Sequence, residues 1–322
     1  MLLLQLLRYP CLLRGWLAPP PCLLALPPVS YSAITHLSHR GQIDPTDTLG
    51  FQSMDTRHRA GAFERDCCFG TTSNMDFFMD NLVLFGSIGM FTVVYFYGYF
   101  FIFNRLWKGR YRYEAASCGM SLTHGTVVAV LCCYEIFSKE WVLDAPNTPF
   151  QDKIMEYSMA YFIVDMLNLA FTAPDDYLFI IHHIGTLSYM ISCRYFIHHG
   201  AVSVMCCIAG GEVTSPVQNI WTLAKLAKDA SQKAKQLFIS ISPYFTVYFS
   251  IVRGGFGPYL TWTLGKFYLR GHADNIMPRW LAWCWMFKLA FAIVASMLWV
   301  KDLWLALFSR TKPQGPVQVK SD

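Results

Sequence analysis

The stretch FIIHHIGTLSYM, residues 179–190, places two adjacent histidines inside a run that is otherwise apolar enough for a membrane. An imidazole at that depth needs a polar partner on another helix or a water-filled cavity, because lipid tails offer no hydrogen bond. The stretch therefore predicts a membrane helix that faces lipid on one side and protein on the other.

The rest of the chain shares this character. Of its 322 residues, 54% are hydrophobic and 15% are charged, which is too apolar for an ordinary soluble domain. Windows of about 20 residues with almost no charge recur, each long enough to cross a hydrocarbon core of roughly 30 Å. We expect an all-α polytopic membrane protein with about seven transmembrane helices, and the absence of strict alternation excludes a membrane β-barrel. The predicted spans lie at about 82–103, 117–138, 154–172, 177–196, 201–222, 240–264 and 280–300.

Basic residues gather in segments that follow the first, fifth and seventh predicted spans, whereas the loop at 139–153 mixes acidic and basic residues. By the positive-inside rule the basic segments face the cytosol, so the N-terminus is lumenal and the C-terminus cytosolic. The formal net charge of +5 is spread over these loops and does not indicate a nucleic-acid partner. The C-terminal QVKSD carries no dilysine or ER-retention signal.

The termini are interpreted apart from the membrane domain, which we place at 75–310. Residues 1–74 begin with a Leu/Pro-rich stretch like a signal or transit peptide and continue as a polar segment without periodicity, which predicts disorder. Met75 opens a plausible membrane-protein start, so the extension is either a targeting segment or dispensable. Residues 311–322 are expected to form a cytosolic tail.

Polar residues recur at helical spacing along one face of several predicted spans. In the third span Ser158, Tyr161, Asp165, Asn168 and Thr172 form a continuous stripe. The ionisable members all fall in the cytosolic half of their spans or near the midplane; they are His124, Asp165, His182, Glu212 and Arg253. Because a charged residue at a helix centre costs ~2.5–3.5 kcal/mol, their convergence predicts a shared polar cavity. The competing interpretation is that they only join helices by hydrogen bonds.

The two histidines cannot serve the same centre, because successive helical residues are about 100° apart. His182 shares its face with small or polar residues, among them Gly185 and Thr186, whereas His183 shares its face with Ile180 and Leu187. We therefore expect His182 to face the cavity and His183 to contact a neighbouring helix. No di-iron histidine box and no CxxC occurs, so we expect neither a metal nor another cofactor.

Four segments, in this order and spacing, resemble the motifs of the TLC-domain family, which includes ceramide synthases, translocating-chain-associating membrane proteins and lipid-homeostasis proteins. They are YFIVDMLN (161–168), IHHIGTLSYM (181–190), GGEVTSPVQNIWTLAK (210–225) and IVRGGFGPY (251–259). The resemblance covers about residues 80–305. It implies six helices in a barrel around a polar, lipid-accessible cavity, with one further N-terminal helix.

The resemblance also bears on function. In ceramide synthases a His-Asp dipeptide follows the histidine pair, but Ala209–Gly210 occupy that position here. The chain is thus similar to the non-synthase branch, and GGEVTSPVQN most resembles plant TLC-domain proteins. Three functions stay open: binding a lipid or acyl chain in membrane lipid homeostasis, N-acylation with acyl-CoA as co-substrate, and service as an ER cargo or translocation partner.

Candidate site residues follow from the stripes and the resemblance together. Those for catalysis are His182, His183 and Asp165, and those for substrate binding are His124, Glu212, Asn219 and Arg253. In the acyltransferase case we expect Asp165 or Glu212 to orient the His182 imidazole. The resemblance places the protein in the endoplasmic reticulum membrane, or in a plastid or other organelle if residues 1–74 are a transit peptide, and a homodimer stays open.

Overall fold

The computed structural model describes residues 74–138 and 140–311, so the predicted extension and tail lie outside the described residues except for positions 74 and 311. Helices account for the regular structure of this part of the chain. In chain order they are α4 (Asn74–Asp80), α5 (Leu82–Tyr97), η2 (Gly98–Ile102), α6 (Arg110–Ser138), α7 (Pro149–Thr172), α8 (Tyr177–Ile191), η3 (Ser192–Ile197), α9 (Ala201–Glu212), α10 (Ser215–Ala227), α11 (Gln232–Phe249), η4 (Ser250–Phe256), α12 (Gly257–Leu269) and α13 (Arg279–Thr311).

Every predicted span is helical, but fewer than seven qualify as membrane-crossing by length and composition. Within the described residues five do: Leu82–Ile102, Arg110–Ser138, Pro149–Thr172, Gln232–Leu269 and Arg279–Ser309. The predicted fourth and fifth spans correspond to α8–η3 and α9–α10. In α8–η3 the histidine pair lowers the hydropathy. Helices α9 and α10 have 12 and 13 residues, so neither is long enough by itself.

Local sequence fixes where α7 begins. The Thr148 hydroxyl accepts a hydrogen bond from the Gln151 backbone N–H at 3.3 Å, and the Gln151 side chain accepts one from the Thr148 N–H at 3.0 Å. Pro149 occupies the first turn, where its missing N–H costs nothing. This start sets the register that turns Asp165 inward.

The predicted fifth span is broken at Val213–Thr214, between α9 and α10. Pro216 has no N–H to offer the Glu212 carbonyl, so the helical ladder is interrupted here. Side chains from η4 and α11 satisfy carbonyls at the break: Arg253 Nη2 donates to Gly211 O at 2.6 Å, and the Tyr248 hydroxyl donates to Val213 O at 2.9 Å. Broken helices occur at membrane depth only where protein groups supply such partners.

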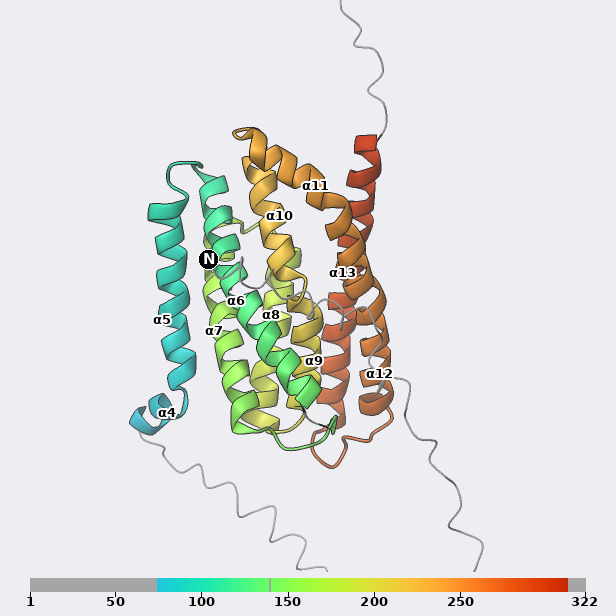
Figure 1. Cartoon of the computed structure of the whole chain (residues 1–322). Helices are drawn as coiled ribbons and strands as arrows, with labels where there is room; N and C mark the ends of the chain where they lie inside the picture. The colour runs from blue at the N-terminus through green and yellow to red at the C-terminus, as the bar shows by residue number, and fades with distance from the viewer. Residues whose placement is uncertain (1–73, 139, 312–322) are drawn as a thin grey trace, which may run out of the picture. The chain divides into compact units, whose positions relative to one another are not determined.

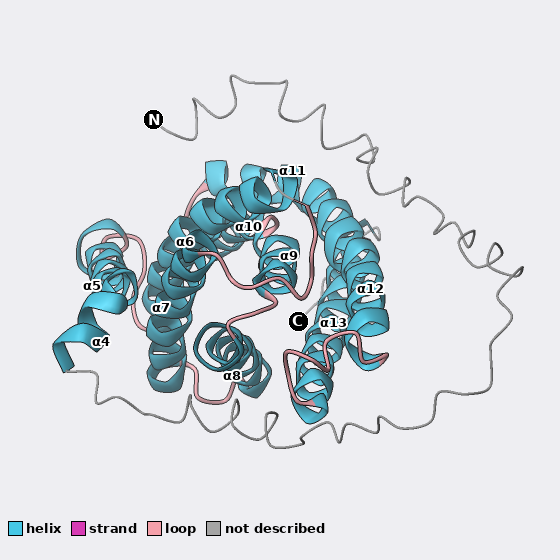
Figure 2. Cartoon of the chain, turned by 90° about the horizontal axis from the view of Figure 1, so that it is seen from below, coloured by secondary structure: helices cyan, strands magenta, loops and turns pink. Residues whose placement is uncertain are grey.

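Neighbouring helices contact one another in a cyclic order: α6, α7, α8, α13, then α11–α12, then α9–α10 and back to α6. Figure 1 shows these elements running up and down beside one another, and Figure 2 looks along their axes. Helix α5 lies outside the cycle, against α7 and α6.

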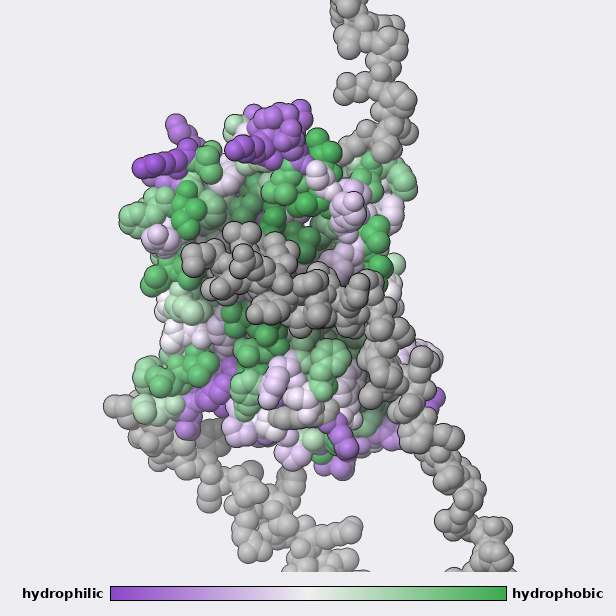
Figure 3. Space-filling model, in the orientation of Figure 1, coloured by the Kyte–Doolittle hydropathy of each residue, from purple (hydrophilic) through white to green (hydrophobic). Residues whose placement is uncertain are grey.

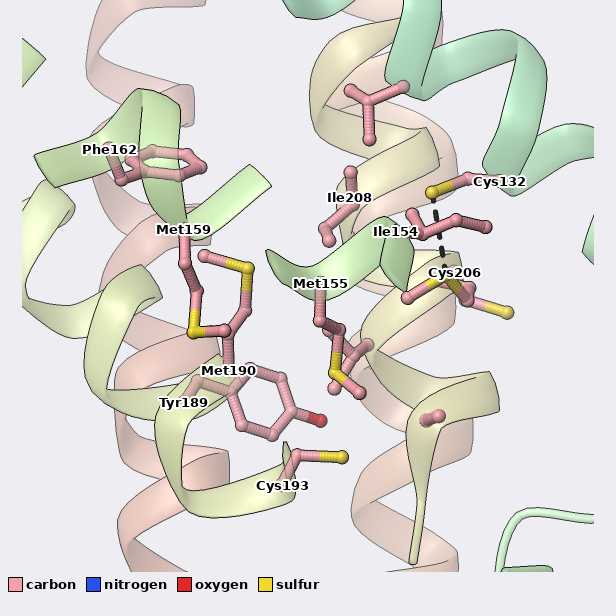
Figure 4. Close-up of a cluster of buried hydrophobic side chains, with 14 of the residues drawn as sticks. Cys132, Ile154, Met155, Met159, Phe162, Tyr189, Met190, Cys193, Cys206 and Ile208 are labelled. Carbon is pink, nitrogen blue, oxygen red and sulfur yellow. Dashed lines mark hydrogen bonds between the residues drawn. The ribbon is translucent and has the colours of Figure 1, made fainter. Parts of the chain in front are cut away.

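The core between these helices is rich in sulfur-containing side chains. Figure 4 shows Met159 of α7 packed against Met190 of α8, and both side chains are almost fully buried. Cys132 of α6 approaches the Met205 sulfur of α9 at 3.6 Å. On the face shown in Figure 3, hydrophilic residues gather at the two ends of the helices and hydrophobic ones lie between them. That distribution fits a protein embedded in a bilayer.

Candidate functional site

Two adjoining cavities lie among the helices. The first, which we call the apolar cavity, has a volume of about 390 Å³ and is walled by α8, α9, α12 and α13, with side chains such as Met190, Ile208 and Leu260. The second, the polar cavity, has a volume of about 340 Å³ and lies among α6, α7, α8 and α10. Its wall includes Ser117, Asn168 and Asn219.

The two cavities meet at a common set of side chains. Phe162, His182, Glu212 and Arg253 line both of them. Three different elements of the chain supply the polar members of this set, namely α8, the end of α9 and η4. A molecule that is polar at one end and apolar at the other fits such a junction, because each end meets a wall of its own character.

Both ring nitrogens of His183 have protein partners, and these contacts hold helices together. Its ring is 3% exposed, and its Nε2 lies 3.0 Å from Asp165 Oδ2 while its Nδ1 lies 2.9 Å from the Phe179 carbonyl. A carbonyl only accepts, so Nδ1 carries a proton, and one further proton is shared between Nε2 and the carboxyl group. Neither ring nitrogen is left to take a proton from a ligand.

His182 has the opposite environment. Its ring is half-buried and lines both cavities, and among the described residues no hydrogen bond or ion pair engages it. His183 lines the polar cavity as well, and the planes of the two rings are 81° apart. Both nitrogens of His183 have protein partners, so His182 is the imidazole of the pair whose nitrogens no hydrogen bond engages within the described residues.

The expectation that Asp165 orients His182 is wrong. Asp165 Oδ2 pairs with His183, and its Oδ1 accepts a hydrogen bond from the Ser117 hydroxyl at 2.7 Å. The Tyr161 hydroxyl also donates to Oδ2, at 3.4 Å. Asp165 thus joins α6, α7 and α8, because α7 packs on the side of α8 that carries His183 rather than His182. No hydrogen bond joins Glu212 to His182 within the described residues either.

His124 lies behind the cavity wall. It is fully buried, stacks on Tyr161 with ring centroids 4.0 Å apart, and places Nε2 2.9 Å from the Ser158 hydroxyl. Its Nδ1 lies 3.8 Å from Glu212 Oε2 and has no hydrogen bond. His124 lines neither cavity, so it supports Tyr161 and faces Glu212 without reaching a ligand placed in either space.

The remaining candidates lie in the wall. Asn219 donates to Ser121 Oγ at 3.0 Å and to the Ser215 carbonyl at 2.9 Å, and it lines the polar cavity. Arg253 Nη2 donates to the Gly211 carbonyl at 2.6 Å, and Arg253 and Glu212 line both cavities. Helix α6 approaches Glu212 closely at Gly125, where an added Cβ would lie 2.9 Å from Glu212 Oε2.

Sequence reasoning missed three wall residues. Phe162 stands inside the quoted 161–168 motif and lines both cavities, but a lone aromatic residue in a membrane helix gives no signal of its own. Tyr189 and Lys288 line the apolar cavity. Lys288 did carry a signal, because an isolated lysine inside a predicted span is a functional-site hypothesis by default. Within residues 74–138 and 140–311 no group of three His, Cys, Asp or Glu side chains could hold a metal ion.

Comparison with known proteins agrees with the motifs. Residues 114–305 match the TLC domain. A TLC domain-containing protein of Arabidopsis thaliana is 38% identical over 226 residues, which cover 69% of this chain and 89% of that protein. No solved structure matches. The matched region contains the cavity junction, the histidine pair and the broken helix, and on these grounds the chain belongs to the TLC domain family.

Proposed function

We propose that this multi-pass membrane protein binds a lipid or acyl chain and acts in membrane lipid homeostasis. The observation that carries the proposal is the junction: an apolar and a polar cavity share His182, Glu212 and Arg253. The alkyl chain occupies the apolar cavity and the polar part of the molecule lies against the shared residues. The cyclic order of helix contacts supports the expected barrel, with these cavities in its interior.

The direction of entry follows from the charges. The polar cavity is lined by Arg110 at the start of α6 and by Asp176 just before α8, which lie at the same end of the helices as the α10–α11 connection. That connection carries Lys228, and Lys233 lies in the first turn of α11. By the positive-inside rule this end is cytosolic, so the headgroup enters from the cytosolic side of the proposed endoplasmic reticulum membrane.

The test is to fill the apolar cavity. Gly185 lines it, and a Cβ added there meets no atom within 4 Å. Gly185→Leu should therefore fold, occupy the chain site and lower the amount of lipid that co-purifies with the full chain, measured by native mass spectrometry. The matched control is Gly89→Leu on α5, which also has open space at Cβ but lies outside both cavities. Equal lipid in wild type and both variants contradicts the proposal.

A second candidate is an acyl-CoA-dependent N-acyltransferase, and the unengaged His182 imidazole at the junction favours it. The acyl chain lies in the apolar cavity with its thioester carbonyl at the junction. As the amine nitrogen bonds to that carbon and the C–S bond breaks, His182 takes the amine proton and passes it to the thiolate. Amide and free coenzyme A result. His183 and Asp165 hold α8 in place behind it.

This candidate is tested by product formation. Purified protein is supplied with a long-chain acyl-CoA and a long-chain amine, and amide is quantified by mass spectrometry for wild type and His182→Ala. Amide from wild type and at least ~100-fold less from the variant supports the acyltransferase, since general acid–base catalysis contributes about 10²–10⁴-fold. Lipid binding without amide formation supports lipid binding in membrane lipid homeostasis and contradicts the acyltransferase. If neither lipid nor amide is found, the cargo or translocation-partner function takes first place.

A further inference from the structure

Lys288 is a charged residue in the apolar cavity that the proposed function does not use. It lies nine residues after the start of α13 at Arg279, or roughly 13 Å along the helix axis at 1.5 Å per residue. Its side chain is half-buried and lines the apolar cavity. An ammonium group this far inside a span is costly unless it faces a partner or a polar ligand.

The part of the chain that the structure describes supplies Lys288 with no ion-pair partner. Among these residues no hydrogen bond or ion pair involves Lys288, in contrast to Lys153, whose Nζ lies 3.0 Å from Glu156. The carboxylate that lines the apolar cavity is Glu212, and no ion pair joins it to Lys288. Lys288 therefore lines the cavity wall without a carboxylate partner among the described residues.

Lys288 lies close along α13 to a group of buried side chains. It is one turn after Trp285, which is buried and donates to Ser192 Oγ at 2.8 Å. Tyr189 packs edge-on against Trp285 at 4.5 Å and hydrogen-bonds the Ser203 hydroxyl at 3.0 Å. Tyr189 lines the cavity whereas Trp285 and Ser203 do not, so this group forms its floor.

The cavity also reaches the outer surface. Ile181 of α8 and Phe287 of α13 line it and are 51% and 75% exposed, so an opening lies between these two helices. Lipid can enter there from the side. Lys288 follows Phe287 on α13 and lines the same cavity.

We infer that Lys288 binds an oxyanion carried on an alkyl chain, either the carboxylate of a fatty acid or the phosphate of a lysolipid, that enters the apolar cavity between α8 and α13. The inference rests on the proposed binding of lipid in this cavity and adds that the lipid is negatively charged. The ammonium group is paired by the ligand, and the chain lies along the apolar wall. Cation–oxyanion hydrogen bonds are among the stronger polar contacts in proteins.

The experiment compares ligands that differ only in charge. Purified full-length protein in detergent is titrated with two matched pairs: a long-chain fatty acid against the fatty alcohol of the same length, and lysophosphatidate against the corresponding monoacylglycerol. Wild type is expected to bind at least one anionic member about tenfold more tightly than its neutral counterpart, equivalent to ~1.4 kcal/mol. The pair that shows the preference identifies carboxylate or phosphate.

Variants then locate the preference. Lys288→Met keeps an unbranched chain without the charge and should abolish the preference, so that the charged and neutral members of each pair bind with equal affinity. Lys288→Arg should retain the preference. Lys301→Met is the control, because Lys301 is on the same helix, exposed and outside both cavities. If Lys288→Met does not fold, Lys288→Gln takes its place.

The outcomes separate this inference from the proposed function. Binding of none of the four ligands by wild type removes both. Equal binding of charged and neutral members, or a preference that survives in Lys288→Met, overturns the Lys288 site alone and leaves lipid binding intact. In that case the ammonium group turns toward the membrane surface and serves no ligand.

Discussion

The adjacent histidines differ in what surrounds them, and that difference should appear in measurements. His183 is buried between Asp165 and the Phe179 carbonyl, whereas His182 lines both cavities and makes no hydrogen bond within the described residues. His183→Ala should lower the free energy of unfolding by about 1–3 kcal/mol, because it leaves the buried Asp165 carboxyl short of a donor. His182→Ala should change it by less than ~0.5 kcal/mol. Thermal unfolding of the purified variants measures both.

A double-mutant cycle tests the pairing directly. Asp165→Asn combined with His183→Ala should be less than additive, since both changes remove one contact. Asp165→Asn combined with His182→Ala should be additive within about 0.5 kcal/mol. Lipid composition of the purified protein should change in His182→Ala. If stability falls in His182→Ala and not in His183→Ala, the two roles assigned to the pair are reversed.

At this scale the sequence predicts which residues lie inward better than it predicts their partners. The 100° step between neighbours on a helix separates His182 from His183, yet both line the polar cavity, and His182 also lines the apolar one. The partner of Asp165 depends on which side of α8 packs against α7, and periodicity carries no information about that. His124 shows the same limit: its stripe position predicts an inward side chain, but Tyr161 stacks over it and closes it off from the cavity.

At the scale of elements, the break between α9 and α10 shows how distant residues decide a local structure. Pro216 interrupts the ladder, yet whether a membrane helix kinks or separates depends on what satisfies its free carbonyls. Arg253 and Tyr248 come from another part of the chain and do so here. The hydropathy of 201–222 predicts one continuous span, because such a pattern does not include donors some 35 residues away.

Removing one of the donors at the break between α9 and α10 should lower the stability of the protein. Tyr248→Phe deletes the hydroxyl that donates to Val213 O, and the expected loss is about 0.5–1.5 kcal/mol in the free energy of unfolding. Tyr244→Phe is the matched control, because Tyr244 lies one turn earlier on α11, is 78% exposed and makes no hydrogen bond within the described residues. Denaturant titration of both variants distinguishes them. Equal loss in both would mean that the Val213 carbonyl finds another donor.

For the whole molecule, five described segments are apolar and long enough to cross a membrane, and α8–η3 and α9–α10 take part with four of them in the cycle of helix contacts. The histidine pair lowers the hydropathy of α8–η3, and the break leaves α9 and α10 with 12 and 13 residues. Hydropathy predicts the helical segments in their order, whereas seven membrane crossings stay a prediction. It does not predict the division of the interior into two cavities, which arises from side chains such as Phe162 and Arg253 that meet from different helices.

The orientation of the molecule in the membrane is the prediction on which entry of a cytosolic ligand depends. The chain contains no Asn-x-Ser/Thr sequon, so an inserted one reports lumenal exposure without background. Asn147 is unsuitable as a site, because its side chain contacts Asp152 and the Cys193 carbonyl. A sequon in a short linker inserted at the exposed Trp141–Val142 segment should be glycosylated, and one inserted at Asp229, next to Lys228, should not.

A sequon inserted at a third position checks the result from the first two. The Tyr268 hydroxyl donates to the Leu143 carbonyl at 3.4 Å, so the connection between α12 and α13 lies at the same end as the 140–148 loop. A sequon inserted at the exposed His272 should therefore share the outcome of the one at Trp141–Val142. Glycosylation at Asp229 alone would show that the molecule has the opposite orientation. The polar cavity would then face the lumen, and cytosolic acyl-CoA could not serve as a co-substrate. Glycosylation at one of the two paired positions without the other would contradict the helix arrangement itself, since both loops lie at one end of it.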